Sequence, residues 1–248
     1  MAEAEEIREK IDLGGWSHDG FNEVLSRASE ITLIQDRLAF LSERFLGVPY
    51  RADTLTGGID TPEIFVVNLS AMDCFTFIDY IAAMSISADF EDFKKNLRRV
   101  RYRQGQVAFP DRNHFFTDWI YSNPDLFRDI TKEIGAEAAV SVTKKLNTKE
   151  DGALYVDGIG INVRELGYLP TEALDETVAS KIHTGDYAGV YSYKAGLDVS
   201  HVGILVRKKD GVFIRHASSV KKKVLDEPLT GYLDGKPGLV ILRQAVAL

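Results

Sequence analysis

Cysteine is almost absent from this chain: Cys74 is the only one among 248 residues. One cysteine can form neither an internal disulfide nor a cysteine-rich zinc module, so cross-links of these kinds cannot hold the fold together. The composition is 45% hydrophobic and 27% charged, which is ordinary for a globular protein with a packed core. A lone thiol can still act as a nucleophile, so the surroundings of Cys74 decide its interpretation.

Long apolar runs and an excess of basic residues are also missing. No apolar run approaches the roughly 18 residues that a membrane-spanning helix needs. The chain carries 30 basic and 37 acidic side chains, which argues against a nucleic acid or a polybasic membrane contact as partner. The acidic start, Met-Ala-Glu-Ala-Glu-Glu, lacks the basic and apolar regions of a secretory signal. We therefore expect no nucleic-acid partner and no membrane span, and we find no targeting signal in this sequence.

Internal repeats and flexible linkers are absent as well, and residues 1–248 are predicted to form a single domain. Helical spacing of apolar residues within 21–46 predicts an N-terminal helical elaboration over about 1–46. From about residue 185 to 248 the pattern changes to short β-rich runs separated by Gly, Asp or Lys clusters. Helices followed by strands predict an α+β fold.

The segment 89–180 between these parts is less regular. We expect a helix near 89–99 and then a short strand over 99–103. On such a strand, the alternating Arg99, Arg101 and Arg103 would present their guanidinium groups on one face. A solvated or ion-paired face is the favoured interpretation of these three arginines, and binding of an acidic peptide is the alternative.

Cys74 stands at the expected start of a helix, directly after Asp73, a residue type that often caps helix N-termini. A thiol in the first turn of a helix lies at the positive end of the macrodipole, which predicts a lowered pKa and a reactive thiolate. The alternative is that Cys74 is a small buried hydrophobic residue, which is the commoner role of a free cysteine.

Two histidines favour the nucleophile, provided that they meet. His201 begins one predicted strand and His216 ends the next, and any even-membered loop between the strands places both on one face of the sheet. A four-residue loop over 207–210 would set them directly opposite each other. A tight turn at Asp210-Gly211, which local propensity prefers, would separate them by about 13 Å along the strands. A catalytic pair of histidines therefore predicts the longer loop.

Five short blocks, in this order, resemble the NlpC-type papain-like cell-wall hydrolases. They are Gly47-Val48-Pro49-Tyr50-Arg51, Asp73-Cys74, Gly185-Asp186, His201-Val202-Gly203-Ile204 and His216-Ala217-Ser218. A further block from Asn113 to Ile120 resembles a bacterial branch of that superfamily related to N-acetylmuramoyl-L-alanine amidases and formerly carried as a domain of unknown function. The resemblance implies a papain-like core in which a Cys-bearing helix packs on an antiparallel β-sheet, with helical additions.

The resemblance also implies roles for individual residues. Cys74 would be the nucleophile, His201 the general base and then acid, and His216 the group that orients His201. Tyr50 and Asp73 would lie near the substrate. The implied substrates are peptidoglycan fragments, cleaved through a thioester at the amide between N-acetylmuramic acid and L-alanine without a cofactor, in the cell envelope or periplasm if a leader has been removed.

One departure from the family pattern affects specificity. A small residue, often Ser, usually follows the Cys and is succeeded by Gly, whereas this chain has Phe75 and Thr76. The departure weakens the alternative of a γ-D-glutamyl–diamino-acid endopeptidase, which clamps a free peptide N-terminus there. A non-catalytic cell-wall binding module and an acyl transferase with a non-water acceptor are further alternatives, and the oligomeric state is open.

The remaining candidates are less distinctive. His114 and Asp118 lie in an aromatic-rich stretch, residues 109–119, which is either a substrate-cleft wall that stacks on sugar rings or a loop tied to the core. His201 and His216 could bind zinc with a carboxylate, and Cys74 could join them, but no H-E-x-x-H or comparable motif is present, so we assign no metal site. His18 and His183 are predicted to be surface residues.

Overall fold

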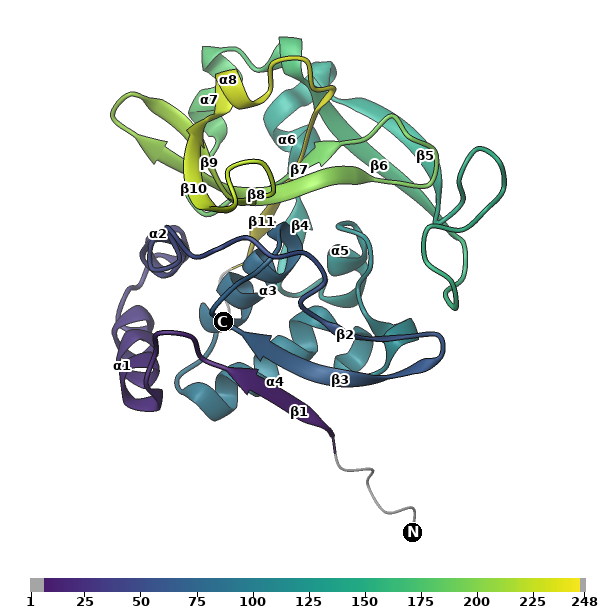
Figure 1. Cartoon of the computed structure of the whole chain (residues 1–248). Coiled ribbons are helices and arrows are strands. Elements are labelled where there is room, and N and C mark those ends of the chain that lie inside the picture. Colours follow the sequence, from purple (N-terminus) through teal and green to yellow (C-terminus); the bar gives the residue numbers. More distant parts are fainter. Residues whose placement is uncertain (1–6, 246–248) are drawn as a thin grey trace.

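The computed structural model describes residues 7–245 and combines helices with two sheets (Figure 1). The large sheet has the strand order β10-β9-β8-β7-β11-β6-β5, with β4 pairing on β11, and all its paired strands are antiparallel. Its strands are β4 (Phe127–Asp129), β5 (Val140–Leu146), β6 (Asn162–Pro170), β7 (Tyr187–Tyr191), β8 (Val199–Lys208), β9 (Gly211–Ser218), β10 (Lys223–Pro228) and β11 (Gly238–Gln244). The predicted α+β class with an antiparallel sheet is confirmed.

A small sheet of order β1-β3-β2 and most helices lie on the other side of the molecule (Figure 1). Its strands are β1 (Glu9–Asp12), β2 (Thr56–Gly58) and β3 (Thr61–Asn68). The α-helices are α1 (His18–Ser29), α2 (Ile34–Glu43), α3 (Cys74–Met84), α4 (Phe90–Arg101), α5 (Asp118–Ser122), α6 (Thr131–Gly135), α7 (Glu176–Lys181) and α8 (Leu229–Tyr232). None of the helices within 7–245 is long and apolar enough to cross a membrane.

Helix α3 is the central helix of the fold. Its residues are buried from Thr76 through Met84, because an almost wholly apolar helix must be covered on every side. It packs against α4 and against strands β8 and β9 of the large sheet. On the opposite face of that sheet, a second apolar cluster includes residues from α6, α7 and α8. The large sheet is therefore covered on both faces, and α3 brings its first residue to the strands that carry both histidines.

A buried ion pair fixes the position of α3. The Asp79 carboxylate accepts hydrogen bonds from Arg101 Nε at 2.9 Å and from Trp119 Nε1 at 3.2 Å. Arg101 Nη1 also donates to the Val66 carbonyl at 2.6 Å, so one cluster joins α3, α4, β3 and α5. The predicted strand over 99–103 is wrong: α4 continues to Arg101, whose side chain faces the core. A helix buries one stripe of residues, and this amphipathic periodicity prevails over the short alternation of arginines.

Candidate active site

The first turn of α3 places Cys74. Asp73 is the N-cap: its Oδ1 accepts the Thr76 backbone N–H at 2.7 Å, while the Thr76 hydroxyl accepts the Asp73 N–H at 3.0 Å. This reciprocal capping box fixes the start of the helix. The predicted helix start at Cys74 and the predicted cap are confirmed. Asp73 Oδ1 is therefore used within the helix turn.

The hairpin of β8 and β9 differs from both loops considered for it. Lys208 pairs with Gly211, so the turn consists of Lys209 and Asp210, and neither the four-residue loop nor the Asp210-Gly211 turn forms. Continuing the register that pairs Ile204 with Arg215 sets His216 opposite Gly203, on the same face as His201 and two residues away. The four-residue loop predicted from the histidines is wrong because a diagonal register also brings them together.

The two imidazoles meet across this diagonal. His201 Nε2 lies 2.7 Å from His216 Nδ1, with the ring planes at 89° to each other. Gly203 makes room for the approach, because a Cβ on it would lie 3.0 Å from His216 Cβ and 2.8 Å from Ile214 Cγ1. A register shift between Val190 and Tyr191 of β7 also leaves Ser200 as an extra residue in β8 directly before His201. Such a bulge re-aims neighbouring side chains.

A carboxylate continues the chain of polar groups. His216 Nε2 lies 2.8 Å from Oε2 of Glu227 on the neighbouring strand β10. Both ring nitrogens of His216 are thus engaged within the protein, which disfavours the zinc alternative. The sequence analysis missed Glu227, although it lies in a short strand that follows the histidine hairpin and could have been tested as a cross-strand neighbour of His216.

Cys74 and His201 line the same cavity, which has a volume of about 170 Å³. His114 lines it as well, together with Phe75 and a carboxylate, Asp198, that accepts hydrogen bonds from Thr117 and Val199. The cavity therefore combines a thiol, two imidazoles, a carboxylate and apolar walls.

Two of its wall residues come from the loop of residues 148–160, which the sequence analysis did not single out. Tyr155 and Val156 reach the cavity because the buried Asn147 side chain holds the loop. Its amide nitrogen donates to the Val156 and Ile159 carbonyls at 3.0 and 3.1 Å, and its oxygen accepts the Val156 N–H at 2.8 Å. One side chain thus fixes the part of the cavity wall that Tyr155 and Val156 form.

The other predicted substrate residues differ in position. His114 Nε2 lies 2.8 Å from the Phe109 carbonyl, which can only accept, so this nitrogen carries the ring proton and Nδ1 keeps a lone pair. Burial lowers the pKa of His114. Asp118 does not line the cavity: its carboxylate accepts the Phe115 N–H and pairs with Arg164, both at 3.2 Å. It holds the loop to β6.

Tyr50 lies beside the residues that precede α3. It bridges to Met72, and Arg51 donates its N–H to the Met72 carbonyl at 3.0 Å. Burial raises the pKa of Tyr50, and the charges of Cys74 and Asp73 raise it further. A second tyrosine, Tyr232 on α8, covers the imidazoles, with ring centroids 4.9 Å from His216 and 6.2 Å from His201. The sequence analysis missed Tyr232.

Burial is the largest contribution to the pKa shifts of Cys74 and His201. It raises the pKa of Cys74 to about 12, with a further contribution from Asp73, although backbone N–H groups of Val202, Cys74 and Phe75 favour the thiolate. The thiol keeps part of its surface open to the cavity, yet the protein around it displaces most of its water. Burial, with His216 and Lys236, lowers the pKa of His201 to about 3. The expected lowering of the Cys74 pKa is wrong because desolvation exceeds the helix-terminus effect. The Cys74 thiol and the His201 imidazole are therefore both neutral in the resting protein.

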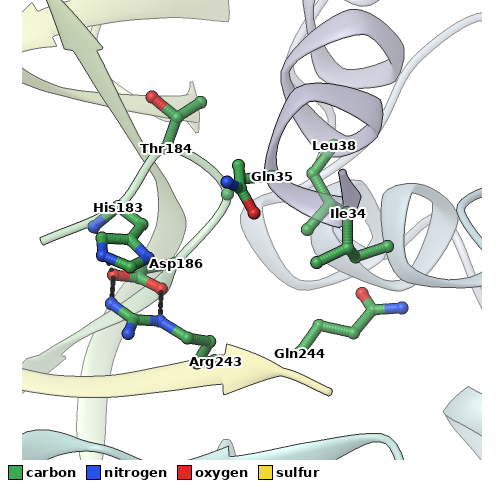
Figure 2. A pocket seen from close by; sticks show the side chains of 9 residues that line it. Ile34, Gln35, Leu38, His183, Thr184, Asp186, Arg243 and Gln244 are labelled. Carbon is green, nitrogen blue, oxygen red and sulfur yellow. Dashed lines mark hydrogen bonds and ion pairs between the residues drawn. The ribbon is translucent and has the colours of Figure 1, made fainter. Parts of the chain in front are cut away.

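A smaller cleft, of about 20 Å³, lies between α2 and the β7–β11 region (Figure 2). Asp186 and Arg243 face each other there in a two-bond ion pair, with distances of 2.7 Å. Asp186 also accepts the His183 N–H at 2.8 Å, so the Gly185-Asp186 block fixes the start of β7. The cleft shares no lining residue with the Cys74 cavity. The predicted exposure of His18 and His183 is confirmed.

Comparisons with known proteins identify structures of similar fold and a sequence family. A search of curated proteins finds no match. Among solved structures, one from Legionella pneumophila shares 22% identity with a TM-score of 0.78, over 92% of this chain and 94% of its own. An N-acetylmuramoyl-L-alanine amidase from Bacteroides uniformis shares 24% identity with a TM-score of 0.67, over 84% of this chain and 98% of its own. A Bacteroides fragilis structure, provisionally described as a xylanase, shares 27% identity with a TM-score of 0.68, over 82% of this chain and 98% of its own.

The structural matches below 25% identity establish a shared fold. The family is established by sequence, because a family model described as N-acetylmuramoyl-L-alanine amidase-like matches residues 40–239. That range includes Cys74, His201, His216 and Glu227 and most of both sheets. The chain therefore belongs to the N-acetylmuramoyl-L-alanine amidase-like family.

Proposed function

We propose that the protein is a cysteine hydrolase that cleaves the amide between N-acetylmuramic acid and L-alanine in peptidoglycan fragments. The observation that carries the proposal is that Cys74, at the first position of α3, shares a cavity with His201. The Nε2 atom of His201 is in turn hydrogen-bonded to His216 Nδ1. Family membership implies a hydrolase with a peptidoglycan-related substrate. In this proposal α3 and strands β8 and β9 form the core of a papain-like arrangement of the NlpC type.

The chemistry follows from the protonation states. A neutral His201 takes the proton of the Cys74 thiol as the sulfur attacks the amide carbonyl. The backbone N–H of Cys74, at the start of α3, is a suitable donor to the resulting oxyanion. The imidazolium of His201 then protonates the leaving amine, and a thioester remains on Cys74. His201 activates water to hydrolyse that thioester, which regenerates the thiol.

The residues around Cys74 favour an amidase over an endopeptidase. Phe75 lines the cavity and packs edge-on against Trp119, with ring centroids 5.9 Å apart, where an endopeptidase would present a small hydroxyl. Asp73 Oδ1 is already used by the capping box. The clamp for a free peptide amine is therefore incomplete, whereas Phe75 and Tyr155 offer aromatic surface to a sugar ring. The aromatic stretch 109–119, for which a cleft wall and a loop tied to the core were both considered, serves both purposes: Phe115 and Phe116 line the cavity, whereas Trp119 is fully buried in the core.

Glycoside hydrolysis has less support at this cavity. That reaction ordinarily uses two carboxyl groups on either side of the scissile bond. The cavity is lined by one carboxylate, Asp198, and hydrogen bonds from Thr117 and Val199 engage both of its oxygens. A location in the cell envelope or periplasm, after removal of a leader, remains part of the proposal, as do the roles of Tyr50 and His114 near the substrate.

Product analysis tests the proposal. A muramyl-tripeptide and the same tripeptide without its sugar are incubated with the protein, with Cys74→Ser as the matched control, and the products are identified by mass spectrometry. We expect free sugar and a peptide that begins with L-Ala from the first substrate, no cleavage of the second and no turnover by the control. Cleavage of the sugar-free peptide after D-Glu at a comparable rate would replace the amidase by the endopeptidase. Full activity of Cys74→Ser would exclude the thioester route.

A further inference from the structure

Three neighbouring strands each contribute one polar side chain to a single diagonal line. His201 is on β8, His216 on β9 and Glu227 on β10. Glu227 pairs in register with Ile214, so it lies two residues from the position opposite His216, just as His216 lies two residues from the position opposite His201. Both steps run in the same direction across the sheet. The contacts of 2.7 Å and 2.8 Å therefore form one continuous hydrogen-bond chain.

The direction of every proton in this chain is set from its Glu227 end. An ionised carboxylate can only accept a hydrogen bond, so His216 must donate from Nε2, and a neutral His216 then has an unprotonated Nδ1. That unprotonated nitrogen can only accept a hydrogen bond, so His201 must donate to it from Nε2. A neutral His201 consequently has its lone pair on Nδ1, the nitrogen that remains free of the chain and can receive the thiol proton.

We propose that Glu227 is a positioning residue that fixes the tautomers of His216 and His201 and thereby makes His201 a base toward Cys74. The inference rests on the proposed cysteine mechanism, in which His201 passes through an imidazolium. At that step the proton from Cys74 is on His201 Nδ1, and the positive charge is stabilised through His216 by the Glu227 carboxylate. Without the carboxylate, His216 can hold its proton on Nδ1, which obliges His201 to carry its own proton on the nitrogen that should accept.

A purely structural role is a weaker explanation of the contact. The same pair of strands is already joined by Arg215, which donates to the Asp226 carboxylate at 2.7 and 2.9 Å. The His216 side chain is 2% exposed and that of Glu227 is 28% exposed, so the hydrogen bond extends from the protein interior toward its surface. Other charged or titratable groups near the histidines are Lys236, Asp226, Tyr232 and Cys74. The ammonium of Lys236 disfavours an imidazolium, which increases the need for a carboxylate.

The tautomers can be measured directly, without substrate. Nitrogen-15 NMR of labelled protein near pH 7, with His201→Gln and His216→Gln for assignment, reports which ring nitrogen carries the proton. We expect Nε2–H for both residues in the wild type and a mixture of tautomers in Glu227→Gln. Nδ1–H as the main form of either histidine in the wild type would overturn the proposal, and so would unchanged tautomers in Glu227→Gln. This readout is independent of the amidase assignment.

Steady-state kinetics of the Glu227→Gln variant provide the second test. Glu227→Gln should lower kcat by about 10- to 100-fold with little change in KM, because it removes a charge-assisted hydrogen bond that strengthens during catalysis. Glu137→Gln is the matched control, since Glu137 is exposed and remote from the cavity lining. Wild-type kcat in Glu227→Gln, or an equal loss in Glu137→Gln, would overturn the proposal. Should Glu227→Gln fail to fold, the wild-type spectra alone decide the tautomers.

Discussion

Replacing Gly203 by alanine should separate the imidazoles of His201 and His216. A Cβ at this position would lie 2.8 Å from the Arg215 carbonyl oxygen, 2.8 Å from Ile214 Cγ1 and 3.0 Å from His216 Cβ. The first contact is with the backbone of the paired strand, which cannot move without disturbing the ladder. Overpacking of this kind costs about 1–3 kcal/mol of folding free energy. Relief by displacement of β9 would carry His216 away from His201.

The assay compares Gly203→Ala with Gly58→Ala. Gly58 is also in a strand, but a Cβ on it would meet nothing within 4 Å. Urea denaturation should show a loss of about 1–3 kcal/mol for Gly203→Ala alone. Hydrolysis of muramyl-peptide should show at least a tenfold lower kcat/KM, since about 1.4 kcal/mol at the transition state already gives that factor. If both variants match the wild type in stability and rate, the close approach at Gly203 does not position His216 and the reasoning fails.

Three further predictions concern the titration of Cys74, the titration of the histidines and the buried ion pair. Because burial raises the pKa of Cys74 to about 12, iodoacetamide labelling of the free enzyme should be slow at pH 7 and still rise above pH 9; a plateau below pH 8.5 would contradict it. Burial also lowers the pKa of His201 to about 3 and lowers that of His216, so the unfolded chain binds more protons there below about pH 6.5. Urea titrations should therefore show stability falling from pH 6.5 toward pH 3, less steeply in His201→Gln. Finally, Arg101→Met leaves the Asp79 carboxylate buried without its cation and should cost about 3–5 kcal/mol, whereas exposed Arg128→Met should cost almost nothing in the same denaturation assay.

The sequence indicated the helix start and the two histidines because those features are local. Asp73 before an apolar helix and histidines at strand ends can be recognised from neighbouring residues alone. The hairpin register could not, since a turn at 209–210, rather than at 207–210 or 210–211, depends on which strand pairing buries both faces. The absence of a Cβ on Gly203 then allows the diagonal pair of His201 and His216 to meet, and the need for this space is visible only once the strands are paired.

The missed residues have a common physical reason. Glu227 and Tyr232 contact the histidines through cross-strand and helix–sheet packing, which a single amino-acid sequence does not reveal. The direction of the Cys74 pKa shift also could not be predicted from neighbouring residues. The sequence indicates a helix terminus, but it does not show how much water the folded protein removes from around the thiol. Arg101 shows the same limit: its ion pair with Asp79 spans 22 positions of the chain and exists only after α3 and α4 pack together.

The loop held by Asn147 forms part of the cavity wall independently of the elements that carry Cys74, His201 and His216. The groups that react in the proposed mechanism lie on a helix and on paired strands, while Tyr155 and Val156 reach the same cavity from a segment held by one amide side chain. Exchanging residues 148–160 for a loop of another length would thus reshape the cavity wall without moving the thiol or either imidazole. For protein engineering, this loop is therefore the part of the cavity wall that can be exchanged. The grafted loop must offer backbone carbonyls that accept hydrogen bonds from the Asn147 amide.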